Sequence, residues 1–268
     1  QAGEGDLEAA LPILKTALQK EFPGKMSEAL DYMQNNKLYD FSAEPNKMHA
    51  GYTTILNEYS APFMFINSSD YRQPDTVIHE FGHYYNFYLM PELKWNDNNN
   101  LDAAEIHSQA LELLMQPYYD QFFGADQAEG QKIYSIYNMI SSILQGCAED
   151  EFQQAVFANP DLTLEEVNEL HSEIFYQFTG SELYYEWVEI HHHFETPFYY
   201  ISYATSAISA LEIWAQSLDD RNQALSTYNQ ITQFTTNFKY RDALTSSGLK
   251  DPFTSDCVSE IAAKVKGL

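Results

Sequence analysis

The feature that most constrains the fold is the spacing of the apolar residues, which recur three and four positions apart along most of the chain. That spacing places them on one face of an α-helix. It predicts a mainly α-helical chain, with helices over 6–21, 25–35, 75–90, 101–118, 126–158, 163–178, 181–194, 197–218, 219–238 and 254–266. Thr163 and Glu166 have the spacing of a capping box at the start of one of them. With 268 residues the chain can bury a sizeable core, and we expect a single domain over 1–268.

Strand signals are confined to about residues 50–67. The stretch GYTTILNEYSAPFMFINSS, which begins at Gly51, is rich in aromatic and β-branched residues between turn formers. We therefore expect a small β-sheet just before the helix over 75–90. It would provide either an edge strand that pairs with an extended peptide or an ordinary hairpin packed under that helix, and the sequence leaves both open.

The helix over 75–90 contains the pattern HEFGH, in a chain that has only eight histidines. On a helix, His79 and His83 lie one turn apart on the same face and present two imidazoles to one point, which suits zinc. Glu80 lies one position off that face, where its carboxylate can act as a general base without binding the metal. The alternative is that both are ordinary surface or core histidines.

A catalytic zinc ion takes three protein ligands, so a third one must follow in the sequence. A third histidine at the spacing HExxHxxGxxH is excluded, because the glycine position of that pattern is Asn86 and its last histidine position is Leu89. A carboxylate is then expected, and the candidates within reach are Glu92, Asp97, Asp102, Glu105 and Glu112.

Two of these carboxylates stand out by their surroundings. Glu105 and Glu112 are two turns apart on one face of the apolar helix LDAAEIHSQALELLMQ, whereas Glu92 and Asp97 lie in a loop. Glu105 as a metal ligand and Glu112 as a partner of a ligand histidine would explain why carboxylates occur on such a helix. The alternative is that both are solvated glutamates on an amphipathic helix.

Composition excludes several classes of partner. The formal charge of −25 disfavours nucleic acids and anionic membranes and is compatible with cationic peptides. Cys147 and Cys257 fit neither a disulfide framework nor a CxxC metal site, so we expect a reducing, cytoplasmic location. No apolar run is long enough to span a bilayer, and the chain opens QAGEGD without a methionine, which suggests a fragment.

Three stretches together resemble a known family. HEFGHYYNFY, AEIHSQALE and HHHFETPFYYISYATSAISALEIW are similar to motifs of the M3 family of zinc oligopeptidases, in particular its oligoendopeptidase F-like branch. The resemblance runs, with gaps, from about residue 50 to residue 215. The three motifs together are specific, whereas HExxH alone would indicate only a zincin.

The resemblance implies a zincin-like helical catalytic domain around a channel that admits short peptides, with one zinc ion (Zn2+) per chain. By motif position, His79, His83 and Glu105 would be the zinc ligands and Glu80 the base. Family members are usually longer, with an N-terminal helical region that forms the far wall of the channel. That missing region of the same protein is therefore an expected partner.

The resemblance also implies hydrogen-bond donors for the transition state, which correspond to Tyr203, to Tyr200 or Tyr199, and to His192. The histidine is ambiguous, because His191, His192 and His193 are adjacent and successive helical residues turn by about 100°. Any of the 20 tyrosines could instead serve packing alone.

The expected function is a zinc-dependent endopeptidase, a metalloprotease that hydrolyses peptide bonds in short unstructured peptides. The alternative is a catalytically incomplete half that holds zinc or binds peptides without turning them over.

Overall fold

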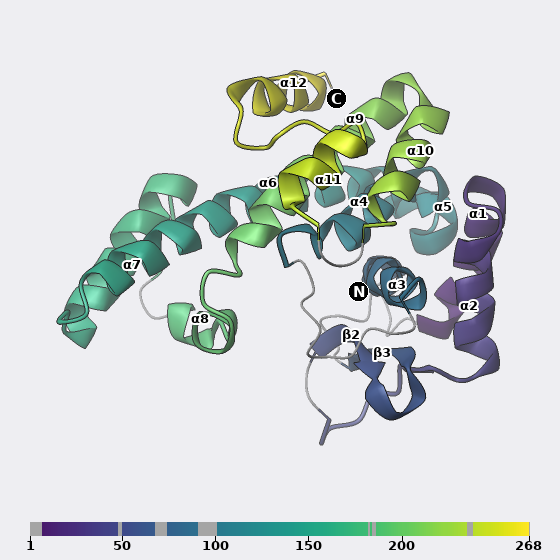
Figure 1. Ribbon diagram of the computed structural model, residues 1–268, viewed down its shortest axis with the longest axis horizontal. Coiled ribbons are helices and arrows are strands. Elements are labelled where there is room, and N and C mark those ends of the chain that lie inside the picture. Colours follow the sequence, from purple (N-terminus) through teal and green to yellow (C-terminus); the bar gives the residue numbers. More distant parts are fainter. Residues whose placement is uncertain are drawn as a thin grey trace.

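The computed structural model describes residues 7–47, 50–67, 74–90, 101–181, 183, 186–234 and 238–267. Over these ranges the chain is mainly α-helical with one small sheet, as the sequence predicts (Figure 1). The helices are α1 (Ala10–Glu21), α2 (Lys25–Asn35), α3 (Pro74–Tyr88), α4 (Ile106–Leu114), α5 (Tyr119–Phe123), α6 (Ala125–Ala158), α7 (Leu164–Thr179), α8 (His192–Glu195), α9 (Ile201–Asp219), α10 (Arg221–Ile231), α11 (Tyr240–Ser246) and α12 (Ser255–Val265).

The sheet has three strands in the order β1-β3-β2. β2 (Ala50–Leu56) and β3 (Ala61–Asn67) form the antiparallel pair expected between 50 and 67. β1 (Tyr39–Asp40) pairs in parallel with β3 and was not predicted, because two residues are too few to show a periodic pattern. β2 is an edge strand and also packs against α3, so its position is compatible with both roles considered for it.

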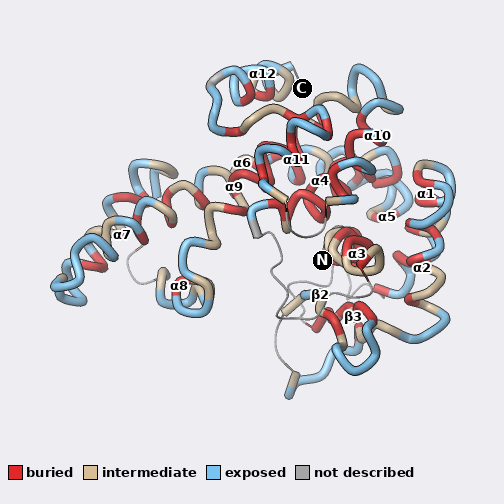
Figure 2. Tube along the Cα trace, in the orientation of Figure 1, coloured by how far each residue is buried: buried red, intermediate tan, exposed pale blue. Residues whose placement is uncertain are grey.

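The main core forms where α3, α4 and α9 pack together, with α1 and α2 against α3. Figure 2 shows the buried residues gathered along these helices and along β3. Every described residue of α4 is buried, including the polar residues His107, Ser108, Gln109 and Glu112. No helix in the described ranges has the length and apolar character that crossing a membrane requires.

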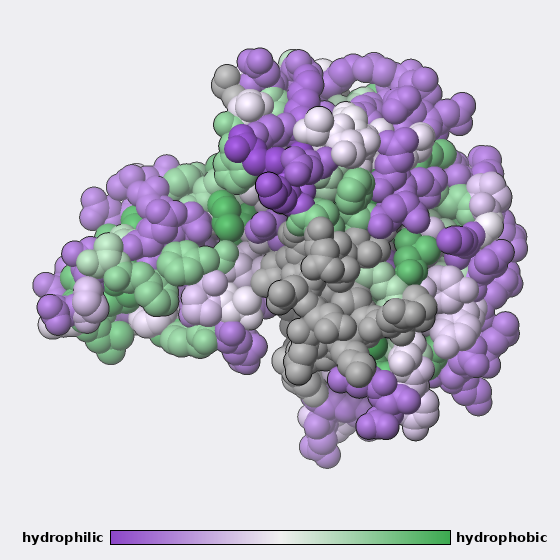
Figure 3. Space-filling model, in the orientation of Figure 1, coloured by the Kyte–Doolittle hydropathy of each residue, from purple (hydrophilic) through white to green (hydrophobic). Residues whose placement is uncertain are grey.

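α6 is the longest helix, and its C-terminal part leaves the main body together with α7 and α8 (Figure 1). Its 34 residues correspond to about 51 Å. A second, smaller core lies within this arm, between α6 and α7, and contains Ala148, Phe152, Val167, Ile174 and Phe175. Figure 3 shows apolar surface on the arm. The exposed large apolar residues of the arm include Phe157, Leu164 and Phe194.

Four expected helices differ from the structure. The segment 101–118 is not one helix: α4 covers only Ile106–Leu114, between 3₁₀ turns at Leu101–Ala103 and Gln116–Tyr118. The segment 181–194 is not one helix: Gly180 ends α7 in the left-handed conformation, and only a short 3₁₀ turn (Glu186–Glu189) and α8 follow. The helix expected from Pro197 begins at Ile201, because Phe198 has φ +66°, which no α-helix accommodates. The helix expected over 219–238 ends at Ile231, and residues 235–237 lie outside the described ranges.

Candidate metal centre and active site

The HEFGH pattern lies in the middle of α3, as its spacing predicts. Pro74 occupies the first helical position, where its missing N–H costs nothing. The rings of His79 and His83 lie one turn apart with their centroids 5.0 Å from each other. The helix thereby directs both imidazoles to the same side.

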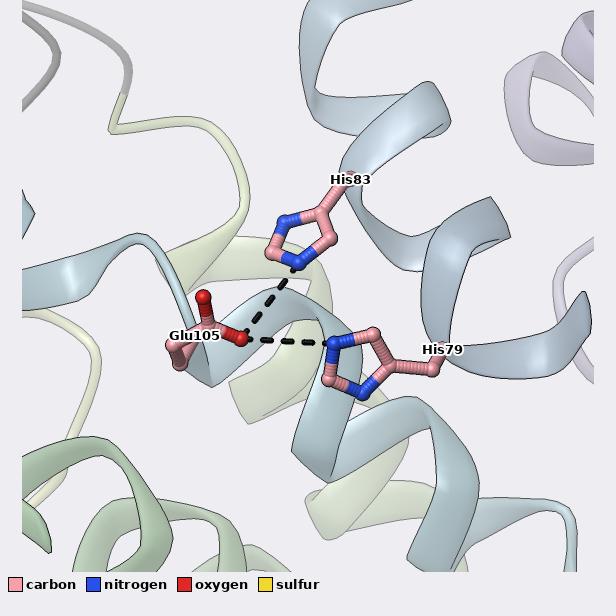
Figure 4. Close-up of side chains that lie close together, drawn as sticks. All are labelled: His79, His83 and Glu105. Carbon is pink, nitrogen blue, oxygen red and sulfur yellow. Dashed lines mark ion pairs between the residues drawn. The ribbon is translucent and has the colours of Figure 1, made fainter. Parts of the chain in front are cut away.

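Glu105 meets these two imidazoles from the start of α4, where it is the N-cap residue rather than a residue inside the helix. Its Oε2 atom lies 3.4 Å from His79 Nε2 and 3.4 Å from His83 Nε2 (Figure 4). In the part of the chain that the structure describes, His79, His83 and Glu105 are the one group of three side chains arranged to hold a metal ion.

Gly82 allows α3 and α4 to approach closely enough for this convergence. A Cβ atom at position 82 would lie 2.5 Å from the carbonyl oxygen of His107 and 2.7 Å from Ser108 Cα, closer than such atoms can pack. The glycine between the two ligand histidines therefore lets the backbone of α4 lie directly against α3, which brings Glu105 within reach.

Hydrogen bonds hold two of the three side chains, His79 and Glu105, in place. His79 Nδ1 lies 2.6 Å from Glu112 Oε1, so the ring donates to that carboxylate and its Nε2 atom faces Glu105. Ser108 donates to Glu105 Oε2 at 3.0 Å, and Tyr199 donates to Glu105 Oε1 at 2.9 Å. Glu112 thus contacts the histidine as expected for a supporting residue.

The electrostatics of the cluster suit a cation. Burial by itself would lower the pKa of His79, but hydrogen bonds and charge from Glu105 and Glu112 raise that pKa well above its ordinary value. Burial would likewise raise the pKa of Glu105, yet the imidazoles of His83 and His79 hold it well below the usual range. Two imidazole nitrogens and one carboxylate oxygen are also the donor set that zinc accepts in catalytic sites, so the residues fit that ion.

Glu80 lies beside the cluster but does not belong to it. The residue is 5% exposed, and Thr53 of β2 donates to its Oε2 atom at 2.8 Å. Burial raises the pKa of Glu80, while the nearby imidazoles of His83 and His79 and the hydroxyl of Thr53 lower it by less. A buried carboxyl with a raised pKa next to a cation site has the properties of a general base.

The C-terminal motif brings three side chains to the same place. His192 Nε2 lies 3.2 Å from the hydroxyl of Tyr203, and the rings of His192 and Tyr199 have centroids 4.9 Å apart. Burial and then the charge of Glu105 raise the pKa of Tyr203 and of Tyr199, so both phenols stay protonated and can donate. Burial lowers the pKa of His192, which favours its neutral form.

The three adjacent histidines enter three different environments. His191 is exposed, His192 is half-buried among tyrosine rings, and His193 is buried on the far side next to Glu149. His192 is therefore the histidine that the structure places beside Tyr203. Tyr200 contacts the rings of His192 and Tyr203.

In a helix over 197–218, as the sequence predicts, Tyr199 and Tyr203 would stand one turn apart on one face, but the structure differs. Tyr199 precedes the first turn of α9, whereas Tyr203 lies inside it. Their rings still meet, with centroids 5.3 Å apart. The turn at Phe198, rather than helical spacing, brings them together.

Sequence reasoning missed several supporting residues. Ser108 stands three positions after Glu105 on the same helix, so its spacing could have revealed it. Thr53 carries no such signal, because it reaches Glu80 from a strand 27 positions away. The hydrogen bond between Tyr199 and Glu105 spans 94 positions and was equally invisible.

The fold is similar to that of solved peptidases. PZ peptidase A, in a structure with an inhibitor, matches with a TM-score of 0.87 and 26% identity over 98% of this chain and 49% of that chain. A protein assigned as an oligoendopeptidase F matches with a TM-score of 0.88 and 26% identity over 98% of this chain and 48% of its own. A protein of Bacillus anthracis with the same assignment matches with a TM-score of 0.83 and 25% identity, over 98% of this chain and 46% of its own.

These matches define how much of a peptidase the chain represents. The chain spans about half the length of the solved structures that it matches, and it corresponds to their C-terminal part. No protein-family model matches the sequence, and no curated protein matches it either.

Proposed function

We propose, from the premise that this chain has the fold of the M3 peptidases of the oligoendopeptidase F-like branch, that it carries the catalytic site of a zinc-dependent endopeptidase. The observation that carries the proposal is the convergence of His79 and His83 from α3 with Glu105 from the start of α4. Glu80 lies next to the imidazoles of that cluster, and Tyr199, whose ring contacts the rings of His192 and Tyr203, donates to Glu105. A metal-ligand set, a base and oxyanion donors are the parts that hydrolysis of a peptide bond requires.

His79, His83 and Glu105 would hold one zinc ion per chain. When bound, zinc would polarise the scissile carbonyl and activate a water molecule. Glu112 and Ser108 orient two of the ligands, because a ligand whose other polar atom is hydrogen-bonded loses less freedom on binding.

Glu80 would act as the general base. It takes a proton from the attacking water and passes it to the leaving amine, which requires a carboxyl whose pKa is raised toward neutral pH. Thr53 donates to one carboxylate oxygen of Glu80, Oε2, and so helps to fix the orientation of the base. The same hydrogen bond ties the base to the edge strand β2.

Tyr203 and His192 would donate to the oxyanion that forms on the substrate carbonyl. The Tyr203 hydroxyl lies within hydrogen-bond distance of His192 Nε2, and the raised pKa of Tyr203 keeps that hydroxyl protonated. Each such donor typically contributes about 3 kcal/mol to lowering the barrier. Tyr199 already donates to Glu105, so its role would be to orient that ligand rather than to bind substrate.

The proposed substrates are short, unstructured peptides. β2 lies at the edge of the sheet, where an extended peptide could add main-chain hydrogen bonds next to Glu80. The charge of −25 favours cationic peptides over nucleic acid or an anionic membrane. A reducing, cytoplasmic location rests on Cys147 and Cys257, which are both free.

Turnover of a quenched oligopeptide by the zinc-loaded chain tests the proposal. Glu80→Gln should lower the rate by about 10²- to 10⁴-fold without loss of zinc, because it removes the base and none of the ligands. Glu58→Gln is the matched control, since Glu58 is exposed on the turn between β2 and β3. Equal rates for the wild type and Glu80→Gln would contradict the proposal.

A second candidate follows from the length of the chain. Because the chain spans about half of each matched structure, it could hold zinc or bind peptides without turning them over until the other half of such an enzyme is present. Zinc content does not separate the two candidates. Turnover that appears only when that N-terminal region is supplied would favour the second one.

A further inference from the structure

One face of α6 contacts the whole segment that carries His192, Tyr199 and Tyr203. Gly146 and Glu149 are three positions apart, and Gln153 follows four positions later, so the three lie along one side of the helix. Each contacts a different part of the segment between Trp187 and α9. The proposed function uses none of these α6 residues.

Gly146 contacts the first turn of α9. A Cβ atom at position 146 would lie 2.8 Å from Ala204 Cβ and 3.2 Å from the carbonyl oxygen of Tyr200. α9 therefore begins directly against the backbone of α6. This close contact fixes the end of the segment on which Tyr203 lies.

Gln153 contacts the strained turn that precedes Tyr199. The residue is 3% exposed, and its Oε1 atom accepts the backbone N–H of Phe198 at 2.8 Å. Phe198 has φ +66°, a conformation that a bulky residue adopts only when its surroundings impose it. This hydrogen bond therefore helps to impose the turn that directs Tyr199 to Glu105.

Glu149 contacts the helix on which His192 lies. This carboxylate is 1% exposed and lies between two buried imidazoles, with Oε1 3.3 Å from His171 Nε2 and Oε2 3.2 Å from His193 Nε2. The second pair lies within ion-pair distance but outside hydrogen-bond geometry. The other ring nitrogen of His193 is 3.1 Å from the carbonyl oxygen of Trp187. His193, immediately next to His192 in the sequence, thus contacts Trp187 through one ring nitrogen and lies within ion-pair distance of Glu149 through the other.

A buried carboxylate between two imidazoles must lose its hydration, which costs free energy. Apolar residues would fill the same space in a small core without that desolvation penalty. Burial alone would raise the pKa of Glu149, but the two imidazoles lower it, so the group stays ionised inside the arm. What the arrangement provides is a fixed orientation for α8, which has only four residues and no side-chain cap.

We propose that Glu149 and Gln153 are positioning residues that hold His192 and Tyr199 in the arrangement from which, together with Tyr203, they serve the reaction. The inference rests on the proposed function for its catalytic consequence. Its structural part, that these two residues fix the environment of His192, is testable without turnover.

The experiment compares two variants with matched neighbours in the full chain. Gln153→Met keeps the side-chain volume but removes the acceptor for Phe198, and Gln154→Met makes the same change at the exposed next position. Glu149→Gln removes the buried charge, and Asp150→Asn removes one at its half-exposed neighbour. The His192 ring signal is followed in isotope-labelled protein, assigned with a His192→Gln variant, and zinc content is measured in parallel.

Both test variants should shift the His192 signal and move its titration midpoint up toward the ordinary value of 6.5, because the ring becomes less buried. Both controls should leave it unchanged. Both controls and Glu149→Gln should bind zinc like the wild type, whereas Gln153→Met should bind it more weakly, because the turn that directs Tyr199 to Glu105 is loosened. In turnover assays, kcat should fall by about 10- to 100-fold in the test variants with KM within about twofold.

The outcomes separate the two proposals. Absence of wild-type turnover would count against the proposed function, while the His192 signal would still decide the positioning role. An unchanged His192 signal in a folded Gln153→Met variant would overturn the inference, as would equal shifts in Gln153→Met and Gln154→Met. If Glu149→Gln fails to fold, the comparison at positions 153 and 154 decides alone.

Discussion

At the scale of single residues, Glu105 is the residue on which the proposed metal site depends. Its Oε2 atom is the point at which the two imidazole nitrogens converge, and Ser108 and Tyr199 both donate to its carboxylate. A carboxylate that is buried among two imidazoles and two hydroxyls has its whole hydrogen-bonding capacity directed to this site.

Glu105→Ala should therefore lose zinc during mild dialysis. Glu112→Ala should retain zinc with about 10- to 100-fold weaker affinity, because it removes the hydrogen bond to His79 Nδ1 but no ligand. Metal analysis after dialysis compares the two variants with the wild type. Retention of zinc by Glu105→Ala at the wild-type level would show that another residue is the third ligand.

Tyr203 and Tyr199 should differ in what their hydroxyls do. Tyr203→Phe should lower kcat by about two orders of magnitude in an active form of the enzyme, with zinc affinity and KM little changed, because it removes a donor that acts mainly in the transition state. Tyr199→Phe should instead weaken zinc binding, since its hydroxyl is bonded to Glu105. Zinc titration and steady-state kinetics on both variants test the distinction. A Tyr203→Phe variant with wild-type kcat but a lower melting temperature would assign Tyr203 to packing.

At the scale of secondary-structure elements, the crossing of α3 and α4 decides whether the site can form. Ala substituted for Gly82 would place its Cβ atom 2.5 Å from a backbone oxygen of α4, so the two helices must move apart. Gly130, on the open side of α6 with nothing within 4 Å of an added Cβ, offers a glycine in a helix without this constraint.

Gly82→Ala should destabilise the fold by about 1–3 kcal/mol and weaken zinc binding, because Glu105 moves away from the two histidines. Gly130→Ala should be neutral or stabilise by about 0.5–1 kcal/mol, as expected for alanine in place of glycine inside a helix. Denaturant unfolding and zinc titration of both variants provide the comparison. Similar stability and zinc affinity in the two variants would contradict the close-approach argument.

Comparison of the predicted elements with the observed ones shows which of them the sequence could predict. Helices with a long apolar stripe and clear ends were predicted well, such as the one over 25–35 and the one capped by Thr163 and Glu166. The segment around α8 was not, because its course depends on contacts with α6 that lie about 45 positions away in sequence. The two candidate histidine ligands, His79 and His83, were predictable for the opposite reason: their i, i+4 spacing is a local property of one helix, whereas Glu105 comes from a separate element.

At the scale of the whole molecule, the chain divides its apolar residues between a main core and the smaller core of the arm. Glu149 makes the stability of the arm dependent on pH. Because its pKa in the folded state is lowered below the ordinary value of 4.5, it stabilises the fold above that pH, and this contribution disappears as the pH falls through the lowered pKa.

Glu149→Gln should therefore be less stable than the wild type near neutral pH, and the difference should shrink as the pH falls below the ordinary carboxyl range. Denaturant unfolding at about pH 6 and about pH 3, followed by tryptophan fluorescence that includes Trp187 of the arm, measures the difference at each pH. A difference in unfolding free energy that stays constant over this range would show that Glu149 is not ionised in the folded chain.

The glycine of HEFGH also changes how the motif itself should be written for this fold. In the notation HExxH the two middle positions are unspecified, as if any residue could occupy them. Here Phe81 is completely buried in the main core, and position 82 has no room for even one methyl group. The pattern that this pair of helices can accept is thus a histidine, a glutamate, a large apolar residue, a glycine and a histidine, so that all five letters carry information.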